Sequence, residues 1–261
     1  MNLIEIQRVA SENLRKTYFH LGLAIKETTL IKEEGFQAVL GEFEHPICNF
    51  AAGLKLDPWS AKQLVSLALS KKAFNVYALP GDEPEHVNEL LLRNDFRVSY
   101  RLAQLVAPGE AAPIEKLPAM RRAESHETRY AIALFMTEQF FARQTEEFRQ
   151  KVAQATSDAV DLELYDLSEG KHRIAAIMLC HSAHTIGIYN LCVAGPKRGL
   201  GIGRNLTRWA RSMANDQAKL ATLQCDAGIQ DWYEQQGFSR IGSIDVFTLS
   251  KTVRSDIMSI T

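Results

Sequence analysis

The chain has 261 residues, enough for one large domain or two ordinary ones. Hydrophobic residues make up 46% of it and charged residues 23%, which excludes an intrinsically disordered chain. The formal net charge is −1, without the basic excess of a nucleic-acid-binding protein, so we expect no nucleic acid among its partners.

In the first half, strands and helices alternate. The sequence predicts, in chain order, strands at 36–43 and 47–56, a helix opened by Asp57 and Pro58, a strand at 74–79, a helix at 83–94 and a strand at 97–106. Asp57 is a good N-cap, and Pro58 suits the first helical turn.

A proline-rich segment divides the chain. Residues 106–119 read VAPGEAAPIEKLPA, with three prolines and no hydrophobic period. Proline disfavours both helix and central strand, so this composition predicts an inter-domain linker. We expect a first domain at 1–107, a linker at 108–118 and a second domain at 119–261.

The second half gives a clearer pattern. The expected elements are a strand at 120–123, a helix capped by Ser125, a helix at 146–155, strands at 160–167, 173–180 and 185–193, a glycine-rich turn and helix, a strand at 220–225, a short helix at 231–236 ended by Gly237, and a strand at 241–249. LLLRNDFR at 90–97 matches WYEQQGFSR at 232–240 in placement, which indicates a degenerate internal repeat. The predicted fold class is α/β (α+β), with two domains that each hold a mixed, twisted sheet flanked by helices.

Cysteine usage and hydropathy indicate the compartment. The four cysteines, Cys48, Cys180, Cys192 and Cys225, form no C-x-x-C pair, which argues against a zinc module or disulfide scaffold and fits a reducing cytosol. Charges interrupt the apolar runs near residue 1, unlike a signal peptide. The longest apolar stretch, 174–180, is shorter than the roughly 20 residues that span a bilayer. We expect a cytoplasmic protein with no membrane partner.

The glycine-rich turn is the sharpest local signal. Residues 196–203 read PKRGLGIG between a strand and a helix. Glycines there let backbone N–H groups converge on an anion, and the helix N-terminus adds a positive dipole. The turn lacks the Walker A, Rossmann and nucleophile-elbow patterns, which leaves R-x-x-G-x-G, a pattern suited to a phosphate or pyrophosphate. The alternative is a glycine-rich turn between strand and helix that binds no ligand.

Residues 186–242 resemble the core of the GNAT superfamily of acyl-CoA-dependent N-acyltransferases. The resemblance rests on a strand ending in Val193, R-x-x-G-x-G with a long helix, a strand containing LQ, and WYEQQGF. It extends from residue 118 to about 250, and it implies a sheet that splays open between strands 185–193 and 220–225, with coenzyme A in the opening.

The resemblance also implies residue roles. The pyrophosphate would be held by Arg198, Gly199, Leu200, Gly201, Ile202, Gly203 and Arg204, largely through backbone N–H groups. The backbone of Leu191, Cys192 and Val193 would contact the pantetheine arm and the thioester carbonyl. Tyr233 would be the general acid that protonates the departing thiolate. The Cys192 thiol needs no chemical role.

The general base stays open. Tyr189 and Asn190 alternate along the strand near the expected acetyl group, and Glu163 and Glu147 are acidic candidates, so we keep Tyr189, Asn190 and Glu163 as possible substrate residues. Cys180, His181 and His184 lie at a predicted hairpin tip with no fourth ligand in view, so we expect no metal.

The first half departs from the family pattern. Asp57 stands where R-x-x-G-x-G is expected, Leu91 where Tyr233 is expected, and Asp95 where Gly237 is expected. We therefore expect this half to have lost coenzyme binding and either to shape a substrate cleft or to cover the other domain. The expected function is transfer of an acetyl group from acetyl-CoA to a primary amine in a ternary complex. The alternative is a non-catalytic acyl-CoA-binding scaffold or sensor.

Overall fold

A computed structural model of the protein describes residues 1–110 and 120–250. The first half contains α1 (Leu3–Leu23), β1 (Thr29–Lys32), β2 (Gln37–Leu40), β3 (Phe50–Ala52), α2 (Pro58–Leu69), β4 (Asn75–Ala78), α3 (Val87–Arg93) and β5 (Phe96–Pro108). The second half contains β6 (Arg121–Arg122), α4 (His126–Phe140), α5 (Glu146–Asp158), β7 (Glu163–Glu169), β8 (His172–His181), β9 (Thr185–Val193), η1 (Gly195–Lys197), α6 (Ile202–Asp216), β10 (Leu220–Cys225), α7 (Ala227–Glu234) and β11 (Ser239–Leu249).

Most predicted elements are confirmed, and a few bounds were wrong. The strands at 185–193 and 220–225 have the predicted ends, and Asp57 and Ser125 cap α2 and α4. The strand expected at 47–56 is only β3, and the helix expected at 83–94 is only α3. The helix expected at 231–236 begins earlier, at Ala227. Helix α1 and strand β1 were not predicted.

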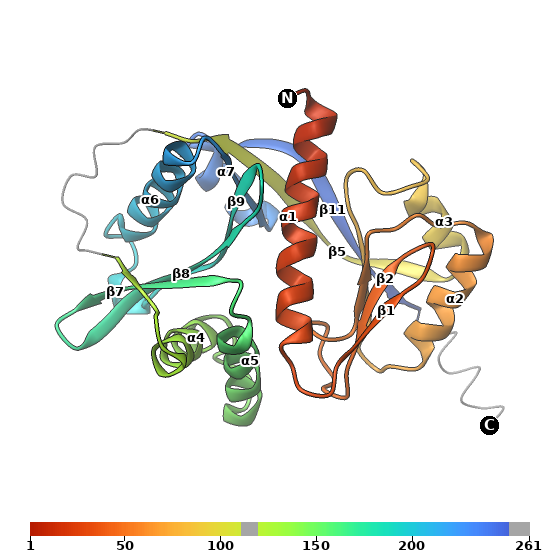
Figure 1. Ribbon diagram of the computed structural model, residues 1–261, viewed down its shortest axis with the longest axis horizontal. Coiled ribbons are helices and arrows are strands. Elements are labelled where there is room, and N and C mark those ends of the chain that lie inside the picture. The colour runs from red at the N-terminus through yellow and green to blue at the C-terminus, as the bar shows by residue number, and fades with distance from the viewer. Residues whose placement is uncertain (111–119, 251–261) are drawn as a thin grey trace.

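The strands form one mixed sheet in the order β1-β2-β3-β4-β11-β5-β10-β9-β8-β7-β6 (Figure 1). The last strand of the first half, β5, and the last strand of the second half, β11, each pair with a strand of the other half. Strand β5 pairs antiparallel with β10 on one side and with β11 on the other, and β11 also pairs with β4. The boundary expected at residue 107 falls inside β5, and most of the linker expected at 108–118 lies outside the described residues.

The three strands on one side of the sheet centre correspond, in mirror order, to the three strands on the other side. Strands β3, β4 and β11 follow one another on one side of the centre, and β9, β10 and β5 do so on the other. The β3–β4 pair and the β9–β10 pair are both parallel, with α2 and α6 as their crossover helices. Helices α2 and α3 lie on the side of the molecule that holds β1 and β2, and α4, α5, α6 and α7 lie on the side that holds β7, β8 and β9 (Figure 1).

Helix α1 lies across the middle of the molecule and packs against β2, β8, β9, β11 and α5 (Figure 1). Its Asn13 side chain is fully buried, donating to the carbonyl of Cys180 (2.9 Å) and accepting from the Tyr189 hydroxyl (2.9 Å). A Cβ at Gly187 would lie 2.0 Å from Asn13 Oδ1, so only glycine permits this approach. The Asn13 side chain thus links α1 to strands β8 and β9 of the second half.

Replacing Asn13 with alanine should destabilise the fold by about 1–3 kcal/mol, because it removes the buried hydrogen bonds of Asn13 with the Cys180 carbonyl and the Tyr189 hydroxyl. Equilibrium unfolding in urea measures this loss. The control is Arg8→Ala, which breaks only an exposed pair with Glu12 and should change stability by less than about 0.5 kcal/mol. Equal stability of the two variants would contradict the anchoring role of Asn13.

None of the helices in the described part of the chain is both long and apolar enough to cross a bilayer.

Candidate functional site

Strands β9 and β10 separate along their length. They pair in parallel only where residues 185–187 face 220–222, and beyond that point the two strands have no ladder with each other. A register shift in the β8–β9 pair marks a bulge, where Asn190 takes a left-handed φ of 47°. The sheet therefore splays open where the sequence predicted it, and the divergence leaves backbone groups of β9 free to pair with an extended ligand.

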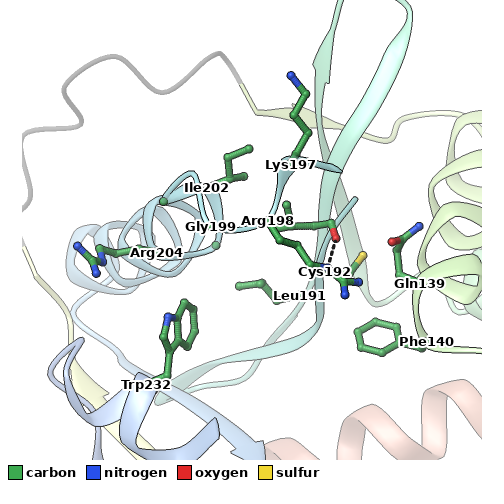
Figure 2. A pocket seen from close by; sticks show the side chains of 13 residues that line it. Gln139, Phe140, Leu191, Cys192, Lys197, Arg198, Gly199, Ile202, Arg204 and Trp232 are labelled. Atoms are coloured by element: carbon green, nitrogen blue, oxygen red, sulfur yellow. Dashed lines mark hydrogen bonds between the residues drawn. The ribbon is translucent and has the colours of Figure 1, made fainter. Parts of the chain in front are cut away.

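A cavity of about 510 Å³ lies at this opening (Figure 2). Its walls include nine of the ten predicted coenzyme-binding residues: Leu191, Cys192, Val193, Arg198, Gly199, Gly201, Ile202, Gly203 and Arg204. Leu200, the tenth, does not line the cavity, and its side chain is 66% exposed. Gln139, Phe140, Lys197 and Trp232 also line the cavity, and sequence reasoning missed them.

The glycine turn has the geometry of an anion site. Gly199 and Gly201 have φ angles of 80° and 77°, which disfavour any residue with a Cβ. A Cβ at either position would meet no other atom within 4 Å, so the space beside the turn is open. The first N–H bonded within α6 is that of Asn205, to the carbonyl of Gly201 (3.0 Å). The N–H groups of Ile202, Gly203 and Arg204 thus have no helical acceptor and suit a bound phosphate.

Basic side chains surround this turn. The Arg198 Nε atom donates to the carbonyl of Val193 (3.0 Å), which ties the turn to the end of β9 (Figure 2). Lys197 pairs with Glu169 (2.5 Å), and Arg204 lines the cavity from the first turn of α6. Together with the helix dipole, these cations favour an anionic ligand at this end of the cavity.

Tyr233, the predicted general acid, is buried and is not among the residues that line this cavity. Trp232 lines the cavity, and Tyr233 is buried between Trp232 (ring centroids 4.7 Å apart) and Phe238 (5.8 Å). Burial, with a smaller contribution from Cys225, raises the pKa of Tyr233 to about 12. Its phenol is therefore protonated at neutral pH, as a general acid must be.

The cysteines near the cavity are protonated as well. Burial raises the pKa of Cys192 to about 12 and that of Cys225 to about 11. Neither thiol offers a nucleophilic thiolate at neutral pH.

Two predicted substrate residues lie away from this cavity. The Tyr189 side chain is buried and donates to Asn13, and neither Tyr189 nor Glu163 lines the cavity. The Glu163 carboxylate bonds to His181 (3.1 Å), Tyr165 (2.8 Å) and Arg122 (2.7 Å), and the bond from His181 is the main cause that lowers its pKa to about 2. Both side chains thus have hydrogen-bond partners within the protein, and their substrate roles stay predictions.

Two further candidates also have defined places. Glu147 is exposed on α5 and pairs with Lys151 (2.9 Å). Asn190 lines a second cavity, of about 270 Å³, beside the bulge. Among the described residues, no group of three or more His, Cys, Asp or Glu is placed to hold a metal ion.

The corresponding place in the first half is closed. Asp57 caps α2 by accepting from the Ser60 N–H (2.7 Å), so a carboxylate stands where α6 has an open glycine turn. Beyond β3, Leu54 donates its N–H to Asp82 (3.1 Å) and accepts from the Glu83 N–H (2.9 Å), while the Leu56 N–H bonds to Glu83 (2.8 Å). The segment that follows β4 is thus hydrogen-bonded to the backbone that follows β3.

A scan of protein-family models and a search of curated proteins found no match to the sequence. Solved structures do match. A GCN5-related N-acetyltransferase from Kribbella flavida has a TM-score of 0.63 and 15% identity over 92% of this chain and 94% of its own. A tandem GNAT protein from the clavulanic acid biosynthesis pathway has a TM-score of 0.59 and 10% identity, over 85% and 83%.

A GNAT-family acetyltransferase from Colwellia psychrerythraea has a TM-score of 0.53 and 12% identity, over 92% and 95%. At these identities the similarity establishes the fold, so the chain has the mixed α/β fold of GNAT acetyltransferases, as the sequence predicted.

Proposed function

We propose that the protein is an N-acetyltransferase that moves the acetyl group of acetyl-CoA to a primary amine. The observation that carries the proposal is the open glycine turn at the N-terminus of α6, facing a 510 Å³ cavity between two diverging strands. Helix α2, the counterpart of α6 in the first half, begins instead at a turn that the Asp57 carboxylate caps.

The residues around the cavity have separate tasks in this proposal. The N–H groups of 199–204, with Arg198 and Arg204 nearby, bind the pyrophosphate. The backbone of β9 at Leu191 and Val193 pairs with the pantetheine arm, and an N–H group beside the bulge polarises the thioester carbonyl. Tyr233 supplies the proton that the sulfur needs.

The reaction balances without a covalent enzyme intermediate. The amine nitrogen attacks the carbonyl carbon, an N–C bond forms, and the C–S bond breaks. The nitrogen of the neutral amine gives one proton to solvent water, the departing sulfur receives one from Tyr233, and water returns a proton to the Tyr233 phenolate. The protonated thiols of Cys192 and Cys225 agree with direct transfer in a ternary complex. In this account, the first half shapes the side from which the amine enters.

A cytoplasmic location is part of the proposal. All four cysteines are free and buried, which agrees with a reducing compartment.

The test is release of free coenzyme A from acetyl-CoA, followed with a thiol reagent in the presence of primary amines, together with mass spectrometry of the amine product. We expect release that requires both the protein and an amine, and a singly acetylated product. The scaffold or sensor alternative predicts acetyl-CoA binding without release for every amine class. The burial of Tyr233 behind Trp232 is the observation that favours this alternative.

A further inference from the structure

The second cavity, of about 270 Å³, lies where the two halves of the chain meet. The first half contributes residues of α1, β3, β4, β5 and the loop before β3, and the second half contributes residues of α5, β9 and the end of α4. Its wall is rich in aromatic side chains: Tyr18, His45, Phe50, Tyr77, Tyr100 and Phe141.

At two places, consecutive residues of the chain line this cavity and the cavity of the proposed coenzyme site. Asn190 lines the smaller cavity, and the next residue, Leu191, lines the larger one. The left-handed φ of Asn190 at the bulge turns the strand between the two. The end of α4 is shared in the same way, since Phe140 lines the larger cavity and Phe141 the smaller. The bulge at Asn190 is therefore the place where the lining of the smaller cavity comes nearest along the chain to that of the larger one.

We propose that the smaller cavity is the acceptor site and that it selects a primary amine carried on an aromatic ring with no other charged group. This inference rests on the acetyltransferase function proposed above. A cavity of about 150 Å³ holds one benzene ring, so 270 Å³ suits a ring with a short aminoalkyl arm, roughly ten non-hydrogen atoms.

The wall gives an additional charge no partner. No Asp, Glu, Lys or Arg is among its lining residues. His45 accepts a hydrogen bond from the Ile47 N–H at Nδ1 (3.1 Å), and burial lowers its pKa, so its ring is neutral at pH 7. A buried carboxylate or second ammonium would lose its hydration without a compensating ion pair. Amino acids and polyamines are therefore disfavoured.

The wall is well arranged for an aromatic ring. The Tyr18 and Tyr77 rings meet edge to face with centroids 4.9 Å apart, and Phe50 meets Tyr77 in the same way at 5.8 Å. A ligand ring can extend this cluster with edge-to-face contacts, and the ring faces attract an ammonium group before it loses its proton.

The test is calorimetric titration of the protein, saturated with coenzyme A, with phenethylamine, phenylalanine and spermidine. We expect phenethylamine to bind at least tenfold more tightly than the other two. Tyr100→Ala should weaken phenethylamine binding by about fivefold to tenfold, because it removes one ring of the wall. Val98→Ala is the matched control, since Val98 lies on the same strand, is also 41% exposed and lies outside the cavity.

Equal or tighter binding of phenylalanine or spermidine would overturn the inference, and so would unchanged phenethylamine binding in Tyr100→Ala. If Tyr100→Ala weakened hexanoyl-CoA binding and spared phenethylamine, the cavity would hold an acyl chain, which also overturns it. The titration needs no turnover. Phenethylamine that binds as expected while only other amines are acetylated would overturn the acceptor role of this cavity and leave the proposed function standing, whereas absence of acetylation for every amine class would refute the proposed function.

Discussion

Gly201→Glu should abolish the stabilisation of this protein by acetyl-CoA. Gly201 has a φ of 77° and faces open space, so a glutamate side chain there extends toward the anion site. Its carboxylate competes with the pyrophosphate for the dipole and the free N–H groups of α6. Acetyl-CoA at about 100 times its dissociation constant should stabilise the wild type by about 2.7 kcal/mol, or roughly 5–10 °C in melting temperature. The variant should show no shift.

The matched control for this experiment is Gly170→Glu. Gly170 lies in the β7–β8 turn with a φ of 60° and open space around it, so it carries similar backbone strain of about 1–2 kcal/mol away from the cavity lining. This variant should melt lower than the wild type and keep the full acetyl-CoA shift. If Gly201→Glu kept its shift as well, the coenzyme would not bind at the glycine turn.

Tyr233→Phe should lower kcat by about 10²- to 10⁴-fold, the usual contribution of a general acid. Acetyl-CoA affinity should stay unchanged, because the phenylalanine ring keeps the contacts with Trp232 and Phe238. Steady-state kinetics and calorimetry separate the two effects. Tyr165→Phe is the control, since Tyr165 is buried too but its hydroxyl bonds to Glu163 outside the cavity. An unchanged kcat in Tyr233→Phe would remove Tyr233 from the mechanism.

The pH dependence of kcat adds an independent check on Tyr233. A raised pKa means that the folded protein keeps the phenol protonated at pH values where a free phenol, with a pKa near 10, has begun to ionise. The acid form therefore predominates up to about pH 12, and Tyr233 ionisation should cause no decline in kcat centred near pH 10. A decline in kcat centred near pH 10 that disappears in Tyr233→Phe would contradict the buried position of this tyrosine.

Local sequence patterns predicted much of the fold. Strands β9 and β10 are bounded by turn residues, and Asp57 and Ser125 are capping side chains, so each could be predicted from a few neighbouring letters. Helix α1 was not predicted because its buried face includes the polar residues Ser11, Asn13 and Thr17, which interrupt the apolar periodicity. The positions of β5 and β11 in the sheet depend on pairing between residues far apart in the chain, which no local pattern encodes.

Some parts of the candidate site could also be predicted from local sequence, and other parts depend on tertiary packing. The glycine turn could be predicted because its backbone conformation is set by its own residues. Tyr189 was a candidate because it alternates along a strand near the expected acetyl group, and Glu163 because it is an acidic residue on another strand. Their hydrogen-bond partners, Asn13 and His181, come from other elements. Trp232 had a local signal, since it precedes Tyr233 in WYEQQGF, whereas Gln139 and Phe140 reach the cavity only through the packing of α4. The aromatic cavity needed both halves of the chain in place.

The most direct test of this account is a calorimetric titration of the wild-type protein with acetyl-CoA to determine its stoichiometry. The open glycine turn of α6 and the closed, Asp57-capped turn of α2 predict a single binding site per chain. Absence of binding, or two equivalent sites per chain, would contradict the account.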